Sequence, residues 1–153
     1  MHFHHEEEDL EDHPIAFHSE GLDFELPHAA EIRSWIQDTA STEGKFISTL
    51  NFIFCSDEYL HTINIEYLKH DTYTDVITFH YAEPDAKYIE GDIFISVERT
   101  AENAESYGVS PEKELQRVII HGVLHLLGYE DKSAAAKAIM TNKEDEYLAM
   151  LAI

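Results

Sequence analysis

The segment that most constrains the fold is VIIHGVLHLL, residues 118–127, which is apolar on nearly every side of a helix. Ser110 and Pro111 precede it as an N-cap and a first helical residue, so the sequence predicts a helix from 111 to about 127. A helix whose end is apolar all round is expected to be buried in the core of a domain. Other parts of the chain must therefore cover it.

The pattern of strands and helices along the chain predicts this cover. Aromatic and β-branched runs indicate strands, and apolar residues at helical spacing indicate helices. We expect strands at 15–18 (a sheet edge), 46–54, 76–81 and 93–97, with Gly91 and Asp92 leading into the last, and further helices at 28–43, after Ser56, at 98–108 and from Ser133 to about 149. This order predicts a single α+β domain over residues 14–153, with a mixed, mainly four-stranded sheet packed against helices.

Two histidines near the end of the 111–127 helix form a candidate metal site. His121 and His125 are four residues apart, so both imidazoles lie on one helix face and can bind one zinc ion. Gly128 fits a helix C-terminal cap where the chain turns back, and Asp131 could then bring a carboxylate to the same ion. Alternatively, the two histidines only satisfy core hydrogen bonds. The glycine and the acid at these offsets favour a metal site at the C-terminal end of the buried helix.

The ligand set indicates a catalytic ion, because three protein ligands leave one position open for water. An aspartate ligand also makes manganese or magnesium more competitive with zinc. Gly122 stands where zinc proteases of the H-E-x-x-H type carry the glutamate that takes a proton from water, so peptide hydrolysis by that route is disfavoured. Glu130, Asp75 or a substrate phosphate could accept the proton, and the sequence identifies no catalytic base among them.

Charge and composition bear on partners and location. With 10 basic and 31 acidic residues the net charge is −21, so a broad basic surface for nucleic acid is not expected. Residues 1–13 combine histidines with acids and are predicted to be a disordered arm, which resembles a tag as much as a natural segment. Cys55 is the single cysteine, and no segment has the pattern of a signal peptide or a membrane span. A cytoplasmic location is therefore expected.

Three stretches of the chain carry motifs of a known family. They are HGVLHLLGYED (121–131), NIEYLKHDTYTDVITF (64–79) and GDIFIS (91–96). They resemble, respectively, HGxLHLxGYDH, NxxYRxxDxPTDVLSF and GDIxIS of the YbeY family of metal-dependent endoribonucleases. Order and spacing also agree, over roughly residues 45–131. By this resemblance His121 and His125 correspond to the first two metal histidines, and Asp131 occupies the position of the third ligand.

The resemblance implies a zincin-like α+β fold with one Zn²⁺ per chain, or another divalent metal because of the aspartate ligand. It implies a zinc-dependent endoribonuclease that cleaves single-stranded RNA, acting in small-subunit ribosomal RNA 3′ end maturation and in ribosome quality control. The expected partner is ribosomal RNA, and neither DNA nor a membrane is expected. Because an acidic surface disfavours bare RNA, we expect the ribosome or a partner protein to present the substrate.

Three positions depart from the family motifs. The third histidine is an aspartate, Tyr73 replaces a proline, and Leu68 replaces an arginine whose guanidinium is expected to hold a phosphate. Lys69 or His70 could compensate in part. These departures leave open a non-catalytic ribosome-assembly factor in which the metal only stabilises the fold, and which a fourth protein ligand would support. A hydrolase of another substrate, such as a peptide or a small ester, is a third interpretation.

The acids of the two other motifs also have more than one interpretation. Asp92 is expected mainly to mark the start of a strand, where its side chain would bond local backbone amides. Asp75 either does the same for its own strand or orients a metal-binding histidine through a hydrogen bond.

Overall fold

Four strands form one mixed sheet in the computed structural model, which describes residues 13–153. They are β1 (Ile15–Glu20), β2 (Phe46–Cys55), β3 (Val76–His80) and β4 (Tyr88–Ser96). Their spatial order is β1-β2-β4-β3, in which β1, β2 and β4 run parallel and β3 pairs antiparallel with β4. The predicted mixed sheet and its edge strand are confirmed. The predicted arm, apart from His13, lies outside the described residues.

Five helices accompany this sheet within the described residues. They are α2 (Ala29–Thr42), α3 (Asp57–Leu68), α4 (Val97–Tyr107), α5 (Pro111–Leu126) and α6 (Ala134–Leu148). The three serines predicted as caps each accept a hydrogen bond from the backbone N–H three residues later, at 3.1 Å for Ser56, 3.2 Å for Ser110 and 3.0 Å for Ser133. None of these helices has both the length and the apolar character needed to span a membrane.

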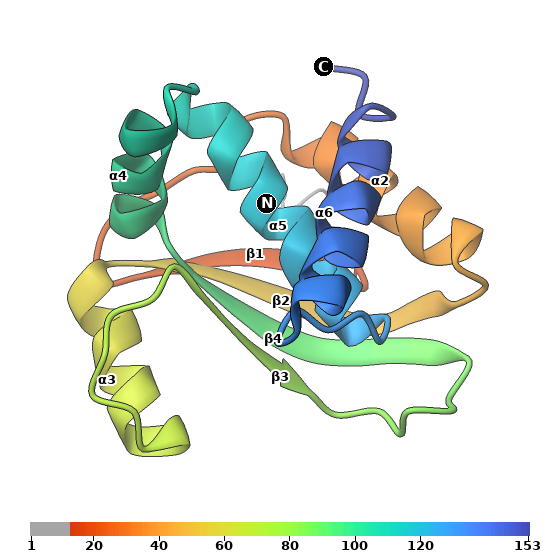
Figure 1. The fold of residues 1–153 in the computed structure, drawn as a ribbon, viewed down its shortest axis with the longest axis horizontal. Helices are drawn as coiled ribbons and strands as arrows, with labels where there is room; N and C mark the ends of the chain where they lie inside the picture. Colours follow the sequence, from red (N-terminus) through yellow and green to blue (C-terminus); the bar gives the residue numbers. More distant parts are fainter. Residues whose placement is uncertain (1–12) are drawn as a thin grey trace, which may run out of the picture.

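The helices cover the two faces of the sheet unequally (Figure 1). Helices α2, α5 and α6 lie over one face, where the larger apolar core forms, and α3 lies on the other side with a smaller apolar cluster. Ile119, Val123 and Leu124 of α5 are fully buried, so the apolar end of this helix lies in the core as expected. The fold is therefore an α+β domain built around α5, and its zincin-like character stays a prediction.

Strand β4 begins earlier than the sequence indicated. Because it starts at Tyr88, Gly91 and Asp92 lie inside the strand and not ahead of it. A Cβ at position 91 would collide with the carbonyl oxygen of Phe79 on β3, so this glycine permits close approach of two strands and does not mark a turn. The Asp92 carboxylate accepts hydrogen bonds from Tyr81 Oη at 2.8 Å and Asn51 Nδ2 at 3.2 Å. The predicted bonding to local amides is wrong.

Candidate metal centre

The last turns of α5 present the two candidate histidines side by side. His121 and His125 are one turn apart, with ring centroids 4.6 Å apart and ring planes at 85°. Their side chains are 21% and 27% exposed, although the same turns of α5 bury their apolar residues completely. The helix therefore anchors the pair in the core while leaving both imidazoles within reach of solvent.

A tight turn brings the third residue back to this pair. The N–H of Gly128 donates to the carbonyl oxygen of His125, and the N–H of Tyr129 donates to that of Leu124, both at 3.0 Å. Gly128 has a φ of +110°, in the region that favours glycine, as expected for the end of the helix. Its position lets the chain fold back along α5, so that Asp131 lies beside the two histidines.

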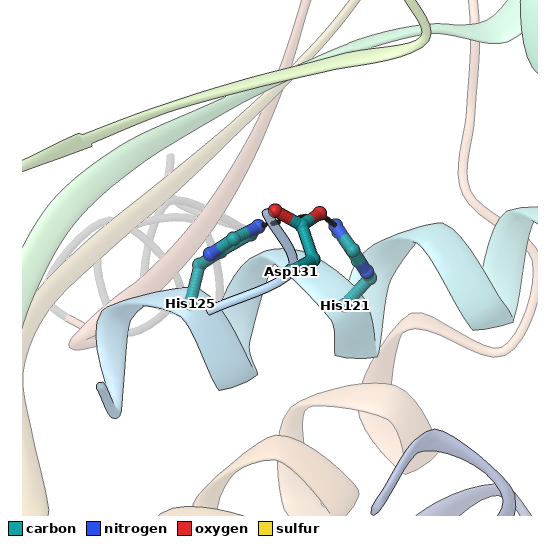
Figure 2. Close-up of side chains that lie close together, drawn as sticks. All are labelled: His121, His125 and Asp131. Carbon is teal, nitrogen blue, oxygen red and sulfur yellow. Dashed lines mark hydrogen bonds and ion pairs between the residues drawn. The ribbon is translucent and has the colours of Figure 1, made fainter. Parts of the chain in front are cut away.

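The three side chains converge on one point (Figure 2). Asp131 Oδ2 lies 3.3 Å from Nε2 of His121 and 3.3 Å from Nε2 of His125. One ligand atom from each residue lies within 4.8 Å of the other two. Nitrogen and oxygen donors about 2.0–2.2 Å from a tetrahedral zinc ion are themselves roughly 3.3 Å apart. The donor types and their spacing therefore fit a single divalent metal ion.

The other ring nitrogen of His121 bonds to a residue that the sequence analysis missed. Its Nδ1 lies 2.6 Å from Oε2 of Glu144 on α6, a carboxylate only 8% exposed. Arg117 Nη1 donates to the second oxygen of Glu144 at 2.8 Å, and Arg117 Nη2 donates to Asp145 at 2.6 Å. The sequence holds one signal for this role, because Glu144 is an acid on the stripe of α6 that also buries Met140 and Tyr147.

The environment of His121 favours its charged form. Burial alone would lower its pKa, but the hydrogen bond and charge of Glu144, with the charges of Asp131 and Asp75, outweigh it, so the pKa is raised. Asp75 therefore acts on His121 through its charge. The hydrogen bond that the sequence had offered to Asp75 as one option is made by Glu144 instead.

The departures from the family motifs lie around α3 and the loop after it. Leu68 is the last residue of α3 and is 39% exposed. The ammonium of Lys69 donates to the carbonyl oxygen of Glu66 at 3.3 Å, within the same helix end. Tyr73 stacks on His61 with centroids 4.0 Å apart, and the guanidinium of Arg99 lies 5.3 Å from the centre of its ring. Tyr73 thus packs between His61 and Arg99 at the place of the family proline, and compensation for the arginine stays a prediction.

Known proteins resemble this chain over most of its length. The family model for endoribonuclease YbeY matches residues 16–152. The chain is 45% identical over 141 residues to the endoribonuclease YbeY of Christiangramia forsetii, covering 92% of this chain and 96% of that one. It is 48% identical over 134 residues to that of Amoebophilus asiaticus, covering 88% and 90%. The solution structure of a Thermotoga maritima protein matches with a TM-score of 0.63 at 26% identity, covering 90% and 88%. The chain belongs to the YbeY family of endoribonucleases.

Proposed function

We propose that this protein is a metal-dependent endoribonuclease that cleaves single-stranded RNA during ribosomal RNA processing in the cytoplasm. His121, His125 and Asp131 would hold one Zn²⁺ per chain, or another divalent ion. Family membership supports RNA cleavage, and the convergence of three donor atoms on one point supports the metal. The specific roles proposed are maturation of the 3′ end of the small-subunit RNA and ribosome quality control.

The three donor side chains suit a catalytic metal ion better than a structural one. When bound, a divalent ion would supply Lewis acidity toward water and toward a phosphate group of the RNA. Within the described residues the donor group numbers three, which leaves a coordination position free for substrate in a tetrahedral site. The three side chains are 21–32% exposed, so an RNA strand could approach them from solvent. This opening supports catalysis over a metal that only stabilises the fold.

Cleavage of a labelled single-stranded RNA by the purified chain tests this proposal. We expect cleavage that a chelator abolishes and that added zinc or manganese restores. His121→Ala should reduce the rate by roughly 100-fold or more, since it removes a metal ligand. His18→Ala, which changes an exposed histidine on β1, is the matched control and should keep full activity. Equal cleavage by His121→Ala and the unchanged chain would contradict the proposal.

The replacement of the family arginine by Leu68 favours a second candidate, a non-catalytic ribosome-assembly factor with a structural metal. Elemental analysis of the same proteins separates the two. Zinc that is lost in His121→Ala, together with no cleavage of bare or ribosome-bound RNA, would support the assembly factor. The arm at 1–13 contains histidines of its own, so only zinc lost in the variant counts toward the site.

A further inference from the structure

The hydrogen bond between His121 and Glu144 fixes which nitrogen of this histidine faces the donor cluster. Nε2 of His121 is the atom near Asp131, so a metal bound there would leave the ring proton on Nδ1, which lies 2.6 Å from Oε2 of Glu144. Rotation of the ring by half a turn would break this bond and turn Nε2 away from Asp131. A carboxylate at this place therefore holds both the tautomer and the orientation that a metal ligand needs.

Glu144 is itself held in position. Its side chain is 8% exposed, and Arg117 donates to the oxygen that does not contact the histidine, at 2.8 Å. The second arm of the same guanidinium is bound by Asp145 at 2.6 Å, which keeps the fork from rotating. The chain Asp145–Arg117–Glu144–His121 thus links α6 to α5 through groups of alternating charge. Such an arrangement directs the Glu144 carboxylate at one atom.

The two candidate metal histidines differ in whether a carboxylate bonds to Nδ1. Within residues 13–153, Nδ1 of His125 has no comparable bond to a carboxylate, and its ring bonds through Nε2 to Asp131 at 3.3 Å. Asp131 lies within the donor cluster, and Glu144 contacts only His121 of its three residues. The support from α6 is therefore directed at one histidine.

We propose that Glu144, held by Arg117, is a positioning residue that orients His121 for metal binding and raises the metal affinity of the site. This inference rests on the proposed metal site. It assigns to α6, which lies outside the HGVLHLLGYED segment, a part in metal binding as well as in packing. Replacement of Glu144 should therefore weaken metal binding beyond any effect on the fold.

Competition for zinc between the full-length protein and a chromogenic chelator measures this effect. Zinc that remains bound in a His121→Ala/His125→Ala variant is subtracted, because it lies elsewhere on the chain. Glu144→Gln should weaken the remaining affinity by roughly 10- to 100-fold. Glu146→Gln is the matched control, since it removes an acid from the same helix at a side chain that is 53% exposed, and its zinc affinity should not change. Glu144→Asp keeps the negative charge but retracts the carboxylate from His121, so it should also weaken zinc binding. This second variant keeps the test valid if Glu144→Gln fails to fold.

Two further measurements separate positioning from simple stabilisation of the fold. Nitrogen-15 NMR of the histidine rings in the zinc-bound protein should report a proton on Nδ1 of His121, and Glu144→Gln should shift that signal but not the one from His125. Unchanged zinc affinity in both Glu144 variants, even with a lower melting temperature of the zinc-free protein, would overturn the positioning role alone. No zinc lost from the His121→Ala/His125→Ala variant would overturn the metal site and this inference together.

Discussion

A side chain at position 122 would point into the sheet. A Cβ built on Gly122 lies 2.9 Å from Cγ2 of Ile93, which is fully buried on β4. A glutamate there would press a carboxylate into the apolar core, and burying an unpaired charge is strongly unfavourable. The glycine thus allows α5 to pack closely on β4, and this packing explains why the glutamate of H-E-x-x-H zinc proteases has no place in the chain.

Gly122→Ala should destabilise the protein through this contact. The added methyl must displace the stiff side chain of Ile93, and overpacking of a core costs typically 1–3 kcal/mol. The higher helix propensity of alanine offsets about 1 kcal/mol of that cost. We therefore expect the free energy of unfolding in urea to fall by about 1 kcal/mol. Lys113→Ala, at an exposed position of the same helix, should leave it nearly unchanged, and a stabilised Gly122→Ala would refute the close packing.

Asp131→His should change which metal the site prefers. Replacement of a hard carboxylate by an imidazole favours zinc, and it disfavours manganese and magnesium. In competition between zinc and manganese, measured on the metal-loaded protein, the ratio of affinities should shift toward zinc by roughly tenfold or more. The same ratio in the unchanged protein and the variant would mean that Asp131 is not a ligand.

At the scale of elements, the carboxylate of Glu43 links three separate segments of the chain. Glu43, at the end of α2, accepts a hydrogen bond from Tyr129 Oη at 2.8 Å and another from Tyr147 Oη of α6. Lys143 Nζ of α6 lies 3.5 Å from the same carboxylate. Burial alone would raise the pKa of Glu43, but the two phenol hydrogen bonds and Lys143 outweigh it and lower the pKa. The turn that carries Asp131 is thus fastened to α2 and α6.

Glu43→Gln should lower the free energy of unfolding relative to the unchanged chain, and this loss should be larger at neutral pH than in acid. The pKa of Glu43 lies below its ordinary value of 4.5. Its ionised form therefore contributes stability that is complete above that value and is lost as the pH falls through the lowered pKa. Hydrogen bonds to a charged group contribute about 1.5–3 kcal/mol, which is the expected loss in free energy of unfolding at pH 7.

Urea unfolding of both proteins from pH 7 to pH 3 checks this prediction. The gap between the two should close on the acid side of 4.5. Glu31→Gln, an exposed acid near the start of α2, serves as control and should give no comparable gap. A difference between Glu43→Gln and the unchanged chain that stays constant with pH would show that the charge of Glu43 contributes nothing.

Local patterns in the sequence predicted most of the elements and singled out the three residues that the fold brings together. Serine caps, helical periodicity and the 121–125–131 spacing are all short-range signals. The contacts that hold the site are not of this kind, because 23 residues separate His121 from Glu144 and 86 separate Glu43 from Tyr129. The start of β4 was missed for a similar reason, since the need for Gly91 arises from Phe79 on the neighbouring strand. Tertiary packing decides such features, and local propensity does not.

At the scale of the whole molecule, acidic side chains far outnumber the positive charges that could meet RNA. The chain has 10 lysines and arginines against 31 acids. Arg99, Arg117 and Lys143 already form ion pairs with carboxylates of the chain itself. Affinity for nucleic acid that does not depend on sequence comes mainly from cations that neutralise phosphates. The active site we propose therefore has little electrostatic help in capturing its substrate, which is why we propose that the ribosome or a partner protein presents the RNA.

Binding of a single-stranded RNA to the zinc-loaded protein, measured by filter retention over a range of salt concentrations, tests this view. We expect a Kd no tighter than about 10⁻⁴ M at physiological salt, the weak end of non-specific binding, and a shallow dependence on salt, because few counterions are released. A variant in which Glu102, Glu105 and Glu112 are replaced by lysine serves as a positive control, since it adds exposed cations and should bind more tightly with a steeper salt dependence. If the unchanged chain already bound bare RNA tightly and lost that binding steeply with salt, a basic surface would have to exist despite the net charge of −21, and no presenting partner would be needed.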